Sequence, residues 1–196
     1  MAKFTKIPAD TFKRLQTNAG VILSDFDPKT GAYDDNDQIG ATSSGITFAA
    51  TPTFSDYGED VDNCPKNTME LKRLDDVDVK LTGTYVTADT AVAKSLMAAA
   101  DIDGTDTTKV VPRRDLSTAD FADIWFVGDY SDKNGATNGG FIAIRVINAL
   151  STGGFQLKTT DKGKGQMAFE YTAHYSISKQ DVVPYELYIK AGTAEA

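Results

Sequence analysis

The sequence predicts a mainly β protein: a β-sandwich or barrel with one flanking α-helix and long interaction loops. Apolar and polar residues alternate in short stretches, which give roughly seven strands at hairpin spacing. A single stretch shows clear helical spacing of its apolar residues. Two long polar segments, residues 25–45 and 56–72, interrupt the strands. We therefore expect residues 1–196 to form one domain.

Composition favours a folded, acidic protein. Hydrophobic residues make up 41% of the chain and charged residues 24%, which is enough apolar surface for a core. The net charge of −8 is unfavourable for gripping nucleic acid, although an acidic wall would surround DNA without holding it. No run approaches the ~20 apolar residues of a membrane helix, and the N-terminus lacks a secretory signal pattern, so we expect no membrane partner.

A short helix and a strand are expected near the N-terminus. Phe12 and Leu15 have weak helical spacing, and Gly20 is placed to end that helix. The apolar residues 21–23 form a short strand candidate. The following segment, 25–45, is rich in Asp, Gly, Ser, Thr and Asn, so it is expected to be a long loop.

Two strands are expected to enclose the second long segment. Residues 46–55 alternate apolar and polar side chains, and Pro52 indicates an edge position or a bulge. Segment 56–72 begins with acidic residues and contains Pro65, which favours a loop. Residues 77–85 alternate again and predict a strand with one solvated face.

A change of period marks the flanking helix. Val92, Leu96 and Ala99 are spaced i, i+4 and i+7, so they form one apolar stripe. Thr87 is expected to cap the N-terminus of this helix, and Gly104 is placed to end it. The pattern predicts a helix of about 14 residues.

The second half of the chain is expected to be mostly strand. Its strand candidates are apolar at alternate positions or at every position, and glycine-rich turns separate them. The candidates are residues 124–127, 141–150, 155–157, 167–178 and 185–189. Turns are expected at 134–140, 152–154 and 161–165, and the tail 191–196 is expected to fray.

No complete catalytic signature is present, so we expect no catalytic residues and no enzyme. His174 is the single histidine and the one candidate base for a Ser-His or Cys-His pair, but no Gly-x-Ser-x-Gly elbow accompanies it. We interpret His174 as an exposed or hydrogen-bonded strand residue. A hydrolase that uses His174 as its base is an alternative hypothesis. The single cysteine, Cys64, excludes a disulfide within the chain and a cysteine metal cluster.

The acidic loops resemble calcium sites only in part. A helix-loop-helix calcium site needs acids at alternate positions, a central glycine and a closing Glu. In residues 25–31, Lys29 occupies a ligand position and no Glu closes the loop; residues 34–37 are a further run of Asp and Asn. Both residue types are also common in turns. We expect no metal and no cofactor, and an ion that orders this loop is the open alternative.

Three stretches, taken in order, carry a resemblance to a known family. They are residues 51–67 (TPTFSDYGEDVDNCPKN), residues 81–86 (LTGTYV) with the helix that follows, and the pair 171–177 (YTAHYSI) and 183–189 (VPYELYI). In their order and spacing, over nearly the whole chain, they resemble the major tail proteins, or tail tube proteins, of siphophages and related prophages. That fold is also similar to the tube protein of type VI secretion.

The resemblance implies a structural role. Members of this family are β-sandwiches with a flanking helix that form hexameric rings, and the rings stack into a tail tube through which DNA is ejected. It implies as partners other copies of the chain, the tape-measure protein and the tail terminator and tail-tip proteins. Genomic DNA would pass through the lumen without sequence-specific binding. The protein would reside in the virion tail, and in the host cytoplasm during assembly.

Contacts between subunits or rings are expected from the two long loops, because a polar loop gains order when a partner supplies contacts. The residues expected to make them are Asp34, Asp35, Asp37, Tyr57, Glu59, Asp60, Asp62, Asn63, Pro65 and Lys66. Residues 124–127 and 141–150, apolar on both faces, are expected to belong to sheets that pair across subunits in a ring. The lumen is expected to carry more Asp and Glu than Lys and Arg.

A different class of function is also consistent with these patterns. A carbohydrate- or surface-binding β-sandwich module of a virion would use exposed aromatic side chains as a platform. The candidates are Tyr130, Tyr171, Tyr175 and Tyr188. Aromatic residues at strand positions more often belong to the core, and the chain has a single tryptophan.

Overall fold

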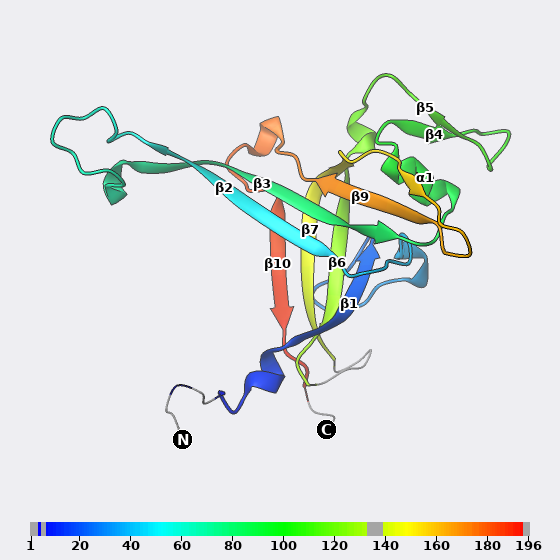
Figure 1. The fold of residues 1–196 in the computed structure, drawn as a ribbon, viewed down its shortest axis with the longest axis horizontal. Helices are drawn as coiled ribbons and strands as arrows, with labels where there is room; N and C mark the ends of the chain where they lie inside the picture. Colours follow the sequence, from blue (N-terminus) through cyan, green and yellow to red (C-terminus); the bar gives the residue numbers. More distant parts are fainter. Residues whose placement is uncertain (1–3, 5–6, 133–138, 194–196) are drawn as a thin grey trace.

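Two antiparallel sheets form the body of the protein (Figure 1). The computed structural model describes residues 4, 7–132 and 139–193. The first sheet has the order β1 (Gln16–Leu23), β6 (Ala122–Tyr130), β7 (Gly140–Ser151) and β10 (Tyr185–Lys190). The second has the order β2 (Thr47–Asp56), β3 (Lys72–Tyr85), β9 (Gln166–Thr172) and β8 (Leu157–Lys158). The end of β7 joins them, because Leu150 and Ser151 pair with β9. The prediction of a mainly β sandwich with one flanking helix is confirmed.

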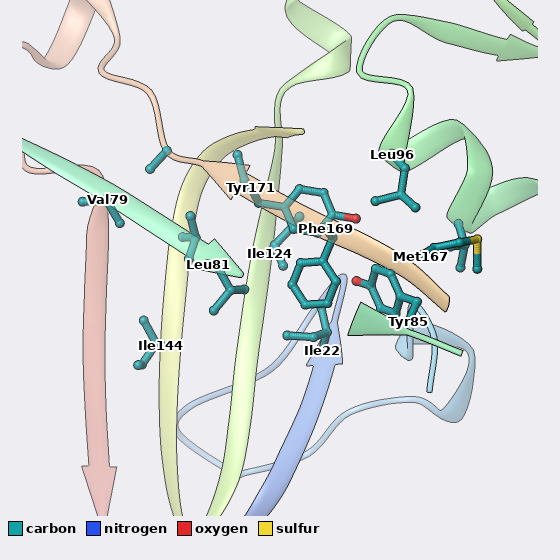
Figure 2. Close-up of a cluster of buried hydrophobic side chains, with 14 residues drawn as sticks. Ile22, Val79, Leu81, Tyr85, Leu96, Ile124, Ile144, Met167, Phe169 and Tyr171 are labelled. Carbon is teal, nitrogen blue, oxygen red and sulfur yellow. The ribbon is translucent and has the colours of Figure 1, made fainter. Parts of the chain in front are cut away.

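The main core lies between the two sheets and the helix α1 (Thr90–Leu96). Figure 2 shows the side chains of all three meeting there. Its largest buried members are Ile22, Val79, Leu81, Tyr85, Val92, Leu96, Ile124, Ile144, Val146, Met167, Phe169 and Tyr171. Each fully buried aliphatic side chain contributes about 1.5–3 kcal/mol relative to an exposed one, so this cluster is what holds the layers together.

The first long segment covers the outer face of the first sheet. Phe26 is buried against Trp125 and Phe141, with ring centroids 5.6 and 5.1 Å away. Farther along, the Ile39 amide donates to the Ile22 carbonyl oxygen (3.0 Å), and the Ile39 side chain packs on the main core. Segment 25–45 is a loop, as expected, but it also supplies apolar anchors to the body.

The helix is shorter than its pattern predicts and starts at a different cap. The Val92 amide donates to the Asp89 side chain (2.7 Å), which makes Asp89 the N-cap, whereas the Thr87 hydroxyl accepts from the Ala41 amide (3.0 Å). The helix ends at Leu96, and Ala98 has a positive φ of 61°. The predicted cap at Thr87 and the length of about 14 residues are therefore wrong.

A short hairpin replaces the expected end of that helix. β4 (Ala100–Ile102) pairs with β5 (Val110–Pro112), and Gly104 lies in the turn between them. The Ser151 hydroxyl donates to the Leu96 carbonyl oxygen (3.0 Å), so β7 satisfies one of the carbonyl groups that the helix leaves free at its end.

The N-terminal helix prediction is also wrong in part. Thr11–Arg14 form a single 3-10 turn, and β1 already begins at Gln16. Gly20 lies inside β1, where the register with β6 shifts between Thr17 and Val21. A bulge in a strand, and not the end of a helix, therefore explains this glycine.

The strand predicted for 167–178 ends early. β9 stops at Thr172, and the chain then moves from β3 to β7: the Ala173 amide donates to the Val79 carbonyl oxygen, and the His174 amide donates to the Ile147 carbonyl oxygen. The predicted turn 134–140 and the tail 191–196 include residues 133–138 and 194–196, which lie outside the described residues. None of the described helices is long and apolar enough to cross a membrane.

Candidate interaction surfaces

A two-stranded arm projects from the body (Figure 1). β3 pairs with β2 from Lys72 onward, but it pairs with β9 only from Lys80 to Tyr85. The outer ribbon and its loop, residues 51–78, form the structure that we call the arm. The Val77 amide donates to the Tyr175 hydroxyl (2.9 Å), so a side chain of the body braces the base of the arm.

One face of the arm continues the core face of the second sheet without cover. Leu81 and Val79 point into the main core and have no exposed surface. Farther out on the same side, Phe54 pairs with Leu74 beyond the register shift at Thr53. Phe54 is 51% exposed and Leu74 is 48% exposed. The apolar pattern of the strands therefore runs past the edge of the core.

The arm also concentrates the negative charge of the protein. Residues 51–78 contain eight Asp and Glu side chains against three Lys and Arg, which gives −5 of the net charge of −8. The acids are Asp56, Glu59, Asp60, Asp62, Glu70, Asp75, Asp76 and Asp78. Lys72 lies above the Phe54 ring, with its Nζ 5.2 Å from the centroid, so one of the three cations covers part of the apolar face.

Asp56 organises the loop at the tip of the arm. The Gly58 amide donates to its Oδ1 and the Asn67 amide to its Oδ2, each at 2.9 Å. These bonds, the one from Gly58 first, hold the pKa of Asp56 below its ordinary value. The Lys72 ammonium donates to the Asn67 side-chain oxygen (3.0 Å). The tip is thus a structured turn that closes across the end of the ribbon.

The predicted contact residues fall into two separate groups. Seven are exposed at the tip of the arm: Tyr57, Glu59, Asp60, Asp62, Asn63, Pro65 and Lys66. The other three, Asp34, Asp35 and Asp37, lie on the body beside the end of β1, where the Ser24 amide donates to the Asp37 carbonyl oxygen (2.8 Å). There the Asn36 amide donates to Asp34 Oδ1 (2.8 Å) and the Asp34 amide to Asp37 Oδ2 (3.0 Å), so these acids cap a single 3-10 turn.

Among the described residues, β10 pairs with β7 alone, so its other edge is a second uncovered surface. The Ile147 amide donates to the Pro184 carbonyl oxygen (2.9 Å), which makes 184 and 147 a hydrogen-bonded pair. Because such pairs alternate, the amide groups of Leu187 and Ile189 point away from β7. Their side chains are 52% and 56% exposed. Both the backbone and the side chains of this edge are therefore available to a partner.

The side chains of His174 and Cys64 each contact neighbouring parts of the fold. His174 Nδ1 lies 3.2 Å from the Asn148 carbonyl oxygen, and the ring packs edge-on against Phe121 at 5.1 Å between centroids. Cys64 is half-buried in the tip loop, with its Sγ 3.4 Å from the Thr68 hydroxyl. Within the described ranges, no group of three or more His, Cys, Asp or Glu side chains is arranged to hold a metal ion.

The four tyrosines proposed as a sugar platform do not gather on one surface. Tyr171 is buried in the main core, and its hydroxyl lies 2.7 Å from Ser95 Oγ. Tyr188 lies on the outer face of the first sheet, beside Trp125, and its hydroxyl donates to Glu186 (2.7 Å). Tyr175 braces the arm. The aromatic residues therefore serve different parts of the fold.

Sequence reasoning missed Leu74 and the outward edge of β10. The predicted loop ends at residue 72 and the predicted strand begins at residue 77, so residues 73–76 belong to neither prediction. The structure places them in β3, where the pairing with β2 shifts its register. One signal was present: the strand 46–55 needs a partner of equal length, which the segment 77–85 alone does not provide.

Neither a search against protein-family models nor a search of curated proteins finds a match for this chain. The assignment of a function therefore rests on the geometry described above and on the sequence resemblance.

Proposed function

We propose that this protein is the self-assembling subunit of a phage tail tube, in which hexameric rings stack to form the conduit for DNA ejection. The observation that carries the proposal is the arm, because its apolar face leaves Phe54 and Leu74 half exposed at a distance from the core. An isolated subunit gains nothing from such a structure. A neighbouring subunit that covers the apolar face of the arm removes this area from water, which stabilises the contact between the two subunits.

The free edge of β10 supports the same proposal. An unpaired strand with exposed Leu187 and Ile189 is a template for pairing with another chain. When the pairing partner is a second copy and the rotation between copies closes, a ring forms and covers this edge in every copy. We therefore propose that the first sheet of each subunit joins that of its neighbours.

The sequence resemblance supports the choice of a tail tube as the polymer and of its partners. In the proposed tube, the subunits contact the tape-measure protein, the terminator and the tail-tip proteins, and the DNA passes through the lumen of the virion tail. The excess of acids over bases is consistent with this role, since a basic wall repeated in every ring would retain phosphate by a salt-dependent attraction.

Electron microscopy of the purified protein over a range of concentrations tests the proposal. We expect rings or tubes at high concentration. A variant in which residues 57–71 are replaced by a two-residue Asn-Gly turn should stay folded by circular dichroism and should not form them, because the ribbon keeps its pairing while the tip is lost. A stable monomer at every concentration that binds glycans would overturn the tube and favour a binding module.

A further inference from the structure

The hairpin between β8 and β9 is the opposite of the arm in charge. Residues 157–166 contain three lysines, Lys158, Lys162 and Lys164, against one acid, Asp161. All three lysines are exposed. The Gly163 amide donates to the Thr160 carbonyl oxygen (3.0 Å), so a tight turn holds two of these lysines at its end. We call residues 155–166 the basic hairpin.

Apolar side chains accompany the charges on both surfaces. Phe155 is 40% exposed and Leu157 56% exposed at the base of the basic hairpin. The arm tip carries Tyr57, Val61 and Met69, which are 59%, 52% and 79% exposed. Each surface therefore combines apolar area with a charge sign that the other surface complements.

The arm and the basic hairpin lie at opposite ends of the long axis of the molecule (Figure 1). A contact between two different surfaces on opposite sides of a subunit is head-to-tail, and repetition of such a contact gives a closed ring or an open filament. The N-terminal segment also combines apolar and basic residues, with Phe12, Lys13 and Arg14, but it leaves the molecule at the lower end of the first sheet and not at the end opposite the arm (Figure 1). It is therefore less suited to receive the arm of the next copy.

We infer that the acidic arm tip of one copy docks on the basic hairpin of a second copy of this chain. The inference rests on the proposed self-assembly and names the two surfaces that meet. Glu59, Asp60 and Asp62 face Lys158, Lys162 and Lys164, and the apolar side chains beside them exclude water from the centre of the contact. Because these charges are exposed, the electrostatic part of the contact weakens as salt shortens the Debye length, which is ~8 Å at physiological ionic strength.

Charge reversal tests the pairing. An arm variant (Glu59→Lys, Asp60→Lys, Asp62→Lys) and a hairpin variant (Lys158→Glu, Lys162→Glu, Lys164→Glu) should each associate at least about tenfold more weakly, because like charges then meet. An equimolar mixture of the two variants should regain association, since each arm then finds an oppositely charged hairpin. Sedimentation velocity measures all three samples.

The N-terminal segment provides the matched control. Reversal of Lys13 and Arg14 to Glu should leave association unchanged, and it should not rescue the arm variant. If this pair rescues the arm variant and the hairpin variant does not, the arm docks on the N-terminal segment and the inference is wrong.

The natural Cys64 in the arm tip gives a second, direct readout. In the Lys162→Cys variant, a bismaleimide should join Cys64 of one copy to the new thiol of the next and give a ladder on a denaturing gel. Two controls should give no ladder: Lys13→Cys in place of Lys162→Cys, and Lys162→Cys combined with Cys64→Ser. Rings or tubes without this ladder would leave the proposed function standing and overturn the docking surface. A ladder from oligomers that are neither rings nor tubes would support the docking surface and overturn the proposed function. A protein that stays strictly monomeric would overturn both the docking surface and the proposed function.

Discussion

Gly20 is the residue at which backbone conformation and packing constrain the sequence most tightly. Its φ is +71°, a region that costs a residue with a Cβ about 1–2 kcal/mol. A Cβ built there would also lie 2.5 Å from Phe126 Cε2 and 2.6 Å from the Val127 carbonyl oxygen. Backbone strain and overlap therefore act together at one position of β1.

We expect Gly20→Ala to lower the free energy of unfolding by about 2–5 kcal/mol, the sum of the strain and of overpacking against β6. The control is Gly45→Ala. Gly45 has a φ of +81° but no atom within 4 Å of a Cβ, so its loss should be only about 1–2 kcal/mol. Urea denaturation of both variants measures the difference, and equal losses would show that contact with Phe126 is unimportant.

Asp56 should make the arm tip sensitive to acid. Since its pKa is depressed in the folded protein, its stabilising effect is fully present above the ordinary value of 3.8 and is lost as the pH falls through the folded pKa. At neutral pH, Asp56→Ala should increase hydrogen exchange at the Gly58 and Asn67 amides, which lose their acceptors. Asp60→Ala in the same loop should leave those amides protected. Unchanged exchange in both variants would mean that Asp56 does not hold the tip.

For single residues, the sequence identifies the positions with a structural role, but it does not reliably identify the role itself. Asp89 and Thr87 are both good candidates for the N-cap of the helix. The Thr87 hydroxyl instead accepts a hydrogen bond from the amide of Ala41, which is distant in sequence, and Asp89 caps the helix. Gly20 is consistent with the end of a helix or with a bulge, and only the pairing of β1 with β6 decides.

Among the elements, β3 shows how one strand serves two purposes. Leu81 and Leu74 lie on the same face of it, but Leu81 is fully buried in the core whereas Leu74 is 48% exposed on the arm. The two positions share residue type, strand and face. They differ only in whether another layer covers them.

We therefore expect Leu81→Ala to lower the free energy of unfolding by about 2–5 kcal/mol, because it leaves a cavity. Leu74→Ser should cost less than about 1 kcal/mol, as for other exposed positions, yet it should impair assembly because the apolar face of the arm is interrupted. Thermal melts and sedimentation of both variants separate the effects. Normal tubes from Leu74→Ser would contradict a role for this face in assembly.

Strands with regular alternation were predictable, and elements set by distant partners were not. β2, β7 and β10 follow their apolar patterns closely. Helix α1 ends before its apolar stripe does. Ala98 has a positive φ and turns the chain toward β4, and the Ser151 hydroxyl donates a hydrogen bond to the Leu96 carbonyl oxygen at the end of the helix. The sequence predicts the two strands of the arm and the loop 56–72 between them, but it begins the second strand at residue 77, whereas β3 already begins at Lys72.

For the whole molecule, the free edge of β10 provides the sharpest test of ring closure. Leu187→Pro removes an amide that points outward, so the monomer should remain folded. Glu186→Pro removes an amide that faces β7 and should destabilise the monomer itself. We expect Leu187→Pro to melt near the wild-type temperature and to form no rings in electron micrographs. Rings with normal dimensions from this variant would exclude pairing along β10.

The class of fold was predictable from alternation and composition, whereas the surfaces for assembly were not. The sequence predicts contacts for residues such as Tyr57 and Glu59 because they lie in a long polar loop, and the structure shows that they are exposed at the tip of the arm. The uncovered apolar face at Phe54 and the edge at Leu187 emerge only when the two sheets are assembled, since exposure is a property of the layers and not of the strands.

The pairing of β1 with β6 also sets an order of events during synthesis. Gln16 pairs with Tyr130, so β1 leaves the ribosome on the order of 10 s before its partner exists, at ordinary rates of translation. β10 follows later still, at residues 185–190. Both outer strands of the first sheet are thus in place only after residues 185–190 have been synthesised. A nascent chain has no complete sheet to offer to a neighbour, which separates translation from polymerisation in time.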